Sequence, residues 1–152
     1  MDPYNHTERL GKLILLKHDV LAQLHELARR QIAVIAADEV DRLMSLLAQK
    51  QTLLTQLQRV EKALDPFRSD DADARLWRTP QERRRCQLLA DRANALLSEL
   101  MLLEKQAEGD LVHSRDNTAR ELSAATSAFA ARQAYVAAPV DARPGLDLMS
   151  EA

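Results

Sequence analysis

The sequence contains few residues that interrupt helices and few large rings. It has three Gly, one Trp, two Tyr and two Phe among 152 residues. The glycines stand at positions 11, 109 and 145, too far apart to form a glycine-rich loop that cradles phosphate. Leu and Ala dominate instead, together with Arg, Glu and Gln. This composition favours long helices that pack through aliphatic side chains.

Other scarcities disfavour whole classes of protein. The net charge of -2 gives no basis for binding nucleic acid. Cys86 is the single cysteine, so an internal disulfide is excluded and a reducing compartment fits. The longest apolar run, "LILL" at 13–16, is far shorter than a membrane span, and the N-terminal residues lack the apolar core of a signal peptide. We therefore expect a cytoplasmic protein without membrane insertion.

Apolar residues recur at helical spacing through the first 64 residues. The spacing predicts one helix over residues 7–36 and a second over residues 39–64. Thr7 is a suitable N-cap for the first helix. Asp38 is the best N-cap near the second, so a tight turn should join the two helices, although no Gly or Pro enforces it.

A loop is predicted over residues 65–79. Pro66 should end the second helix, because the residue before a proline is pushed out of the helical region. Three large apolar side chains within the loop should fold it back onto the end of the bundle: Phe67, Leu76 and Trp77.

A third helix is predicted from "TPQE" at 79–82, where threonine can cap, proline takes the first helical position and glutamate completes a capping box. Up to residue 137 only Gly109 interrupts the pattern, and a single Gly costs about 1 kcal/mol without ending a helix. We expect one helix over residues 80–137, within a single domain over residues 1–137. Residues 138–152, with their prolines, should form a flexible tail.

The lengths of these helices define the expected fold. At about 1.5 Å per residue the third helix would span roughly 87 Å and the first two roughly 45 and 39 Å. The third helix could fold back at "EGD" (108–110), which would give a four-helix bundle. We favour the other arrangement, an all-α antiparallel bundle of three long helices, with the third longest and partly projecting beyond the first two.

Patterns for catalysis are incomplete. His25-Glu26 resembles the start of the zinc motif H-E-x-x-H, but Arg29 stands where the second histidine belongs. The paired Glu-x-x-His of a di-iron bundle is missing. The segment "SDDADAR" (69–75) lacks the glycine and distal glutamate of a calcium loop, and Cys86 has no His or Asp partner along its helix. We expect no enzyme activity, no metal and no cofactor.

Some polar residues interrupt the helical pattern. Lys50 and Gln31 stand in apolar seams where a permanent coiled coil would carry leucine. Three explanations are open: these residues fix the register, the lysine stem reaches out of the seam to solvent, or they leave a groove incompletely filled. The run "RRR" (83–85) opposes the helix dipole, and forms either a solvated face paired with Glu82 and Asp91 or a patch for an acidic partner.

The apolar stripe thins in the second half of the third helix. It continues through Leu111, Thr118, Leu122, Ala125 and Phe129 among many small residues. If this stripe runs past the first two helices, its apolar face needs a chain from elsewhere. Intramolecular packing is the alternative that the sequence leaves open.

Two segments resemble the FlgN-type flagellar export chaperones. The first is "LHELARRQIAVIAADEVDRLMSLLAQKQTLLTQLQRVE" (24–61), in which an acidic turn precedes the pattern LxxLLxxKQxLLxxL. The second is "LLSELMLLEKQAEGDLVHSRD" (96–116). The resemblance covers roughly residues 10–135.

This resemblance implies a helical chaperone of type III export. It would bind the helical C-terminal segment of hook-associated (hook-filament junction) proteins, prevent their premature assembly and deliver them to the export apparatus. The family's substrate site lies toward the C-terminal helix, which places it on Leu111, Thr118, Leu122, Ala125 and Phe129. Tyr135 is a candidate contact with the export gate. The alternative is a self-associating structural coiled coil without a client, and the sequence leaves the oligomeric state open.

Overall fold

The computed structural model describes the backbone of residues 2–142 and the side chains of residues 2–136. Three helices, α1 (Asn5–Ala36), α2 (Val40–Arg68) and α3 (Pro80–Ala142), account for most of the chain, with a 3-10 turn, η1 (Ala72–Ala74), before α3. Residues 2–142 contain no strand. The all-α prediction, with a third helix longer than the other two, is confirmed.

The chain divides into two compact units, Met1–Leu111 and Val112–Ala152. The prediction had one domain over residues 1–137. The first unit holds α1, α2, η1 and the N-terminal half of α3, and the described part of the second unit is the rest of α3. Each unit is described by itself below.

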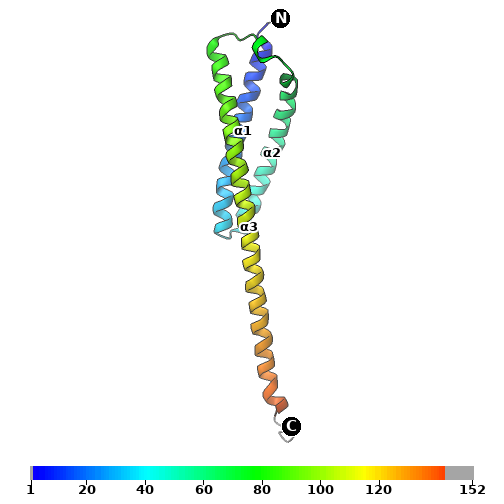
Figure 1. The fold of residues 1–152 in the computed structure, drawn as a ribbon. Coiled ribbons are helices and arrows are strands. Elements are labelled where there is room, and N and C mark those ends of the chain that lie inside the picture. Colours follow the sequence, from blue (N-terminus) through cyan, green and yellow to red (C-terminus); the bar gives the residue numbers. More distant parts are fainter. Residues whose placement is uncertain (1, 143–152) are drawn as a thin grey trace. The chain divides into compact units, whose positions relative to one another are not determined.

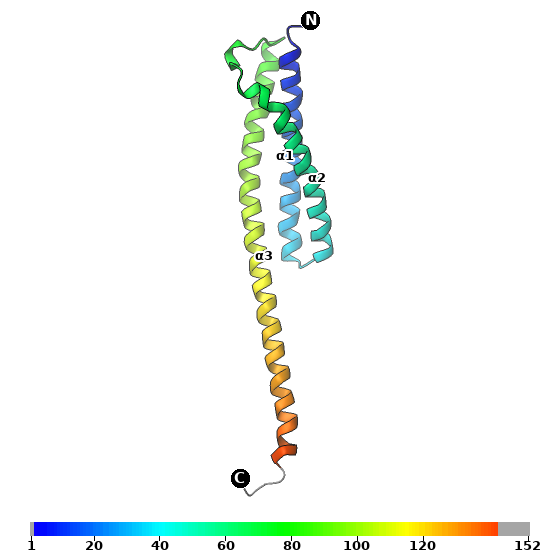
Figure 2. The ribbon, with the colours of Figure 1, turned by 90° about the vertical axis from the view of Figure 1, so that its right-hand side faces the viewer.

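The core of the first unit is aliphatic, as the shortage of aromatic residues requires. In Figures 1 and 2, α1, α2 and the N-terminal half of α3 lie side by side. One buried cluster joins all three helices and consists of Val20, Leu21, Leu24, Leu27, Ala28, Leu53, Ala93 and Leu100. Burying each large side chain contributes roughly 1.5–3 kcal/mol, so this cluster supplies much of the stability of the bundle.

A second buried cluster closes the end of the bundle near the loop. It joins Leu10, Val60, Leu64, Phe67 and Cys86, and Trp77 packs against it. The prediction that Phe67 and Trp77 fold back is confirmed, whereas Leu76 is exposed. The backbone of Leu76 nevertheless faces the bundle, because its carbonyl accepts a hydrogen bond from α1.

The prediction that α2 ends before Pro66 is wrong, because the helix continues to Arg68 with the proline inside it. In the last turn, Pro66 removes only one backbone hydrogen bond from the helix. Phe67, which is 4% exposed, lies in the second cluster and holds this turn in place. The loop is therefore shorter than predicted.

The turn between α1 and α2 depends on Asp38, which is not the N-cap of α2; Glu39 takes that position. Asp38 has a positive φ of 57°. Its amide donates to the carbonyl of Ile35, and the amide of Glu39 donates to the carbonyl of Val34. This pair of bonds is a Schellman motif, in which aspartate occupies the left-handed position that glycine usually takes.

The prediction that Thr7 caps α1 is also wrong, because the helix begins at Asn5. Thr7 is buried, and its hydroxyl donates to the carbonyl of Leu76 over 2.7 Å. The side chain of Asp2 instead accepts from the amide of Tyr4 ahead of the helix. Thr7 therefore joins α1 to the segment before α3, a role that sequence spacing does not reveal.

The start and the continuity of α3 agree with the prediction. The hydroxyl of Thr79 accepts from the amide of Glu82 over 3.1 Å, which caps the first turn. The helix passes through Gly109 without a break, so the alternative with a fold-back at "EGD" is wrong. It runs to Ala142, past the predicted end at residue 137, and the remainder of the predicted tail (143–152) lies outside the described residues.

Candidate functional site

The second unit exposes large apolar side chains along one helix. Leu122 is 67% exposed and Phe129 is 61% exposed. They are separated by two turns, so both lie on the same face of α3. Val136, one further heptad along, is exposed as well. Large apolar groups that recur at heptad spacing form a surface suited to another helix.

The other predicted substrate-binding residues flank these two positions. Thr118 and Ala125 are exposed in the second unit, and the hydroxyl of Thr118 donates to the carbonyl of Ser114 one turn earlier. Leu111 is the last residue of the first unit and is 38% exposed. The second unit thus presents four of the five predicted residues on one helical face.

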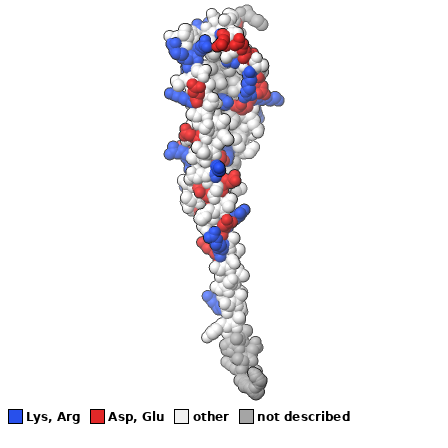
Figure 3. Space-filling view, in the orientation of Figure 1, with Lys and Arg blue, Asp and Glu red and all other residues white. Residues whose placement is uncertain are grey.

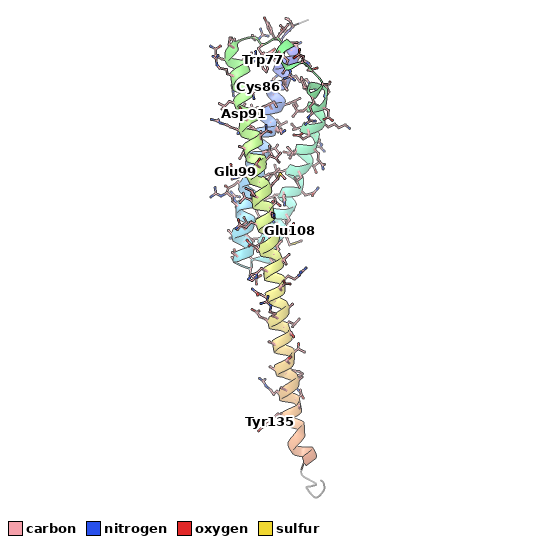
Figure 4. All side chains as sticks on the ribbon, in the orientation of Figure 1. Trp77, Cys86, Asp91, Glu99, Glu108 and Tyr135 are labelled. Atoms are coloured by element: carbon pink, nitrogen blue, oxygen red, sulfur yellow. The ribbon has the colours of Figure 1, made fainter. Side chains whose placement is uncertain are left out.

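Tyr135, the candidate contact with the export gate, is 78% exposed. Figure 4 shows it on the C-terminal part of α3. At about 100° per residue it points roughly 120° away from Phe129 around the helix. The tyrosine therefore faces a different direction from the predicted substrate face, so one helix can present the two groups to different partners.

Charges are sparse on the second unit. Residues 123–131 contain none, and Figure 3 shows few coloured atoms in this part of α3. Arg115 lies 3.4 Å from Asp116, its neighbour in sequence. Arg132 stands between Phe129 and Val136. The prediction from sequence did not include Arg115 and Arg132 in this face. Continuing the same helical spacing by three residues before Thr118 and three residues after Phe129 reaches both arginines.

The two polar residues that interrupt the seams lie inside the bundle of the first unit. Gln31 is buried, and the ammonium of Lys50 donates to Oε2 of Glu104 on α3. Lys50 thus joins α2 to α3 through a partly buried ion pair. The contact agrees with the reading that Lys50 fixes the register of the helices.

The arginines at the start of α3 lie beside the loop. Arg83 approaches Asp73 at 3.9 Å, while Arg84 and Arg85 are exposed. The expected pairing with Asp91 is not seen among the described side chains, since its carboxylate accepts from the side chain of Gln87. The arginine run is therefore mainly a solvated face.

A cleft of about 440 Å³ opens at the loop end of the first unit, lined among others by Trp77, Cys86 and Arg75. Figure 4 shows Trp77 and Cys86 at this end. Burial raises the pKa of the Cys86 thiol, although the charge of Arg75 opposes this effect. A thiol held protonated is a poor nucleophile, so the cleft gives no support for cysteine chemistry.

The histidines of the first unit contact carboxylates rather than one another. His6 lies 2.5 Å from Asp70, His25 lies 3.1 Å from Glu99 on α3, and His18 pairs with its neighbour Asp19. Among the described residues, no group of three or more His, Cys, Asp and Glu side chains could hold a metal ion. Nor does any helix in the described part of the chain have a stretch long and apolar enough to cross a bilayer.

Comparison of the chain with protein-family models, with curated proteins and with solved structures finds no match. The candidate site therefore depends on the residues themselves.

Proposed function

We propose that this protein is a flagellar type III export chaperone that binds the helical C-terminal segment of hook-filament junction proteins. The client helix would lie against the face of α3 that carries Thr118, Leu122, Ala125 and Phe129. By covering the apolar stripe of the client, the chaperone would prevent premature assembly. The protein would act in the cytoplasm without catalysis.

One observation carries this proposal: Leu122 and Phe129 remain exposed on the same face of a helix. Exposing two large apolar groups on one face is unfavourable in water, and covering each contributes roughly 1.5–3 kcal/mol. An amphipathic helix with apolar residues at matching intervals could cover both at once. The sequence resemblance to the FlgN-type family supplies the identity of the client.

The same observation favours a second candidate, a coiled-coil protein that associates with its own copies. Heptad spacing along an exposed face is also what a homodimer uses. Light scattering separates the two candidates. A chaperone should be monomeric alone and form a one-to-one complex with a junction-protein fragment, whereas a structural coiled coil should be a stable dimer that ignores the fragment.

Substitutions on the exposed face test the site. We expect Leu122→Asp and Phe129→Asp each to weaken binding of a junction-protein C-terminal fragment more than tenfold, measured by calorimetry with the full chain. Circular dichroism should show nearly unchanged helix content, because both side chains are exposed. Ala124→Asp is the matched control, since Ala124 is exposed on the opposite side of the same helix. Unfolding of the first two variants, or equal loss with the control, would place the site elsewhere.

A further inference from the structure

The exposed face of the second unit also carries positively charged side chains, to which the proposed function gives no role. Counting alternately three and four residues from Leu122 gives a seam with seven members: Arg115, Thr118, Leu122, Ala125, Phe129, Arg132 and Val136. All seven side chains are exposed. The seam thus contains two cations and three large apolar groups, and none of its members is acidic.

The nearest acidic residues leave these cations available. Arg115 contacts only Asp116 among the described side chains, and that pair is largely exposed to solvent. Exposed pairs of this kind contribute at most about 1 kcal/mol. Around Arg132, residues 128–136 include no acidic side chain at all. A partner could therefore pair with both arginines without displacing a strong internal contact.

A second copy of this chain is a poor occupant of the seam. In a parallel, in-register dimer, Arg115 and Arg132 would each face the same residue of the second copy. In an antiparallel arrangement that overlaps residues 115–132 of both copies, Arg115 would face the second copy's Arg132. Like charges directly opposite one another in a helical seam are destabilising and select against that pairing.

We infer that the seam accepts an amphipathic helix that carries an acidic residue opposite Arg115 and another opposite Arg132, with apolar residues between them. From position 115 to position 132 the seam spans roughly 25 Å at about 1.5 Å per residue. The small side chains of Thr118 and Ala125 allow the partner to approach closely, while Leu122 and Phe129 provide the apolar contacts. This inference rests on the proposed function only in taking the occupant to be a helix.

Two synthetic helical peptides test the inference with the full chain. Both have the same apolar seam; one carries Glu at two seam positions seventeen residues apart and the other carries Lys there. We expect the Glu peptide to bind about tenfold more tightly, and the advantage to shrink in high salt, because the pairs lie at a solvent-exposed interface. Equal affinities of the two peptides would overturn the inference.

Charge reversal in the protein provides an independent measurement. The double variant Arg115→Glu, Arg132→Glu should prefer the Lys peptide, since exchanging both charges restores complementarity. Arg120→Glu is the matched control, because Arg120 lies on the opposite side of α3, and it should keep the preference for Glu. If the double variant fails to change the preference, the inference is wrong.

Failure of this inference is distinguishable from failure of the proposed function. If a junction-protein fragment binds the double variant as tightly as the original chain, the arginines have no part and only the inference falls. If the Glu peptide binds selectively but no junction-protein fragment does, the seam is correct and the proposed client is wrong. A homodimer that Phe129→Asp dissociates would overturn both.

Discussion

The two halves of α3 use similar residues with opposite results. In the first unit, Ala93, Leu100 and Ala107 are buried, the first two in a cluster formed by all three helices. In the second unit, Leu122 and Phe129 recur at comparable spacing but are mostly exposed. A helical apolar stripe therefore does not show by itself whether the rest of the chain covers it.

The polar contacts differ in the same way. Ion pairs and hydrogen bonds of the first unit join elements distant in sequence, such as Lys17 with Glu61 and Thr7 with Leu76. In the described part of the second unit, the recorded side-chain bonds span at most one turn, as between Thr118 and Ser114. Among the described residues, contacts between elements hold the first unit together, whereas the side-chain bonds of the second unit stay within its helix.

The largest expected effect comes from making the same substitution in both units. Leu24→Ala should destabilise the protein by about 2–5 kcal/mol, because Leu24 is 1% exposed and its loss leaves a cavity. Leu122→Ala should change the free energy of unfolding by no more than about 0.5 kcal/mol. Denaturation by urea, followed by circular dichroism, measures both. Similar losses would mean that Leu122 belongs to a core.

A pair of threonine substitutions should give a smaller difference. Thr7→Val removes a buried hydroxyl and leaves the Leu76 carbonyl without this donor, at a cost of about 1–3 kcal/mol. Thr118→Val removes only an exposed bond within one helix and should be nearly neutral. Thermal unfolding of the two variants measures the contrast. If Thr7→Val leaves the stability unchanged, the hydrogen bond from Thr7 to Leu76 adds little to holding the segment before α3 against α1.

Sequence periodicity was sufficient to predict the helices and their order. Helical spacing and the cap at Thr79 identified the three helices, and the absence of a strong breaker at Gly109 predicted the continuity of α3. The errors lie at helix ends. Asp38 and Thr7 have residue types that cap helices, but tertiary contacts and turn geometry gave them other positions.

The candidate site was predictable only in part. Helical spacing placed Leu122 and Phe129 on one face. Whether that face is exposed depends on the chains around it, and a local sequence pattern does not predict those chains. Arg115 and Arg132 were missed because a search for apolar residues passes over charges that share the same seam. At Pro66 the local signal was misleading. Proline predicts the end of a helix, but burial of Phe67 keeps the last turn of α2 helical.

The two glycines within helices allow a gain of stability in place of a loss. An added Cβ would meet nothing within 4 Å at either Gly11 or Gly109. Gly11→Ala and Gly109→Ala should therefore each stabilise their helix by about 0.5–1 kcal/mol. Hydrogen exchange distinguishes them, because slower exchange should appear across the bundle for Gly11→Ala and mainly near the boundary of the two units for Gly109→Ala. Destabilisation by either variant would indicate a requirement for close approach at that glycine.

The smallest expected effect is a dependence of stability on pH that comes from Glu61 in the first unit. Burial alone would raise the pKa of Glu61, but the hydrogen bond and charge of Lys17, with Arg68, outweigh it and hold the pKa below its usual value of 4.5. This lowered pKa stabilises the folded chain above about pH 4.5, and the contribution is lost as the pH falls through the folded-state value. Because Glu61 is partly exposed, Glu61→Gln should cost only about 0.3–1 kcal/mol at pH 7 and less at pH 3. Urea denaturation at the two pH values measures this difference. A constant cost for Glu61→Gln at both pH values would mean that packing of the side chain, rather than its charge, joins α1 to α2.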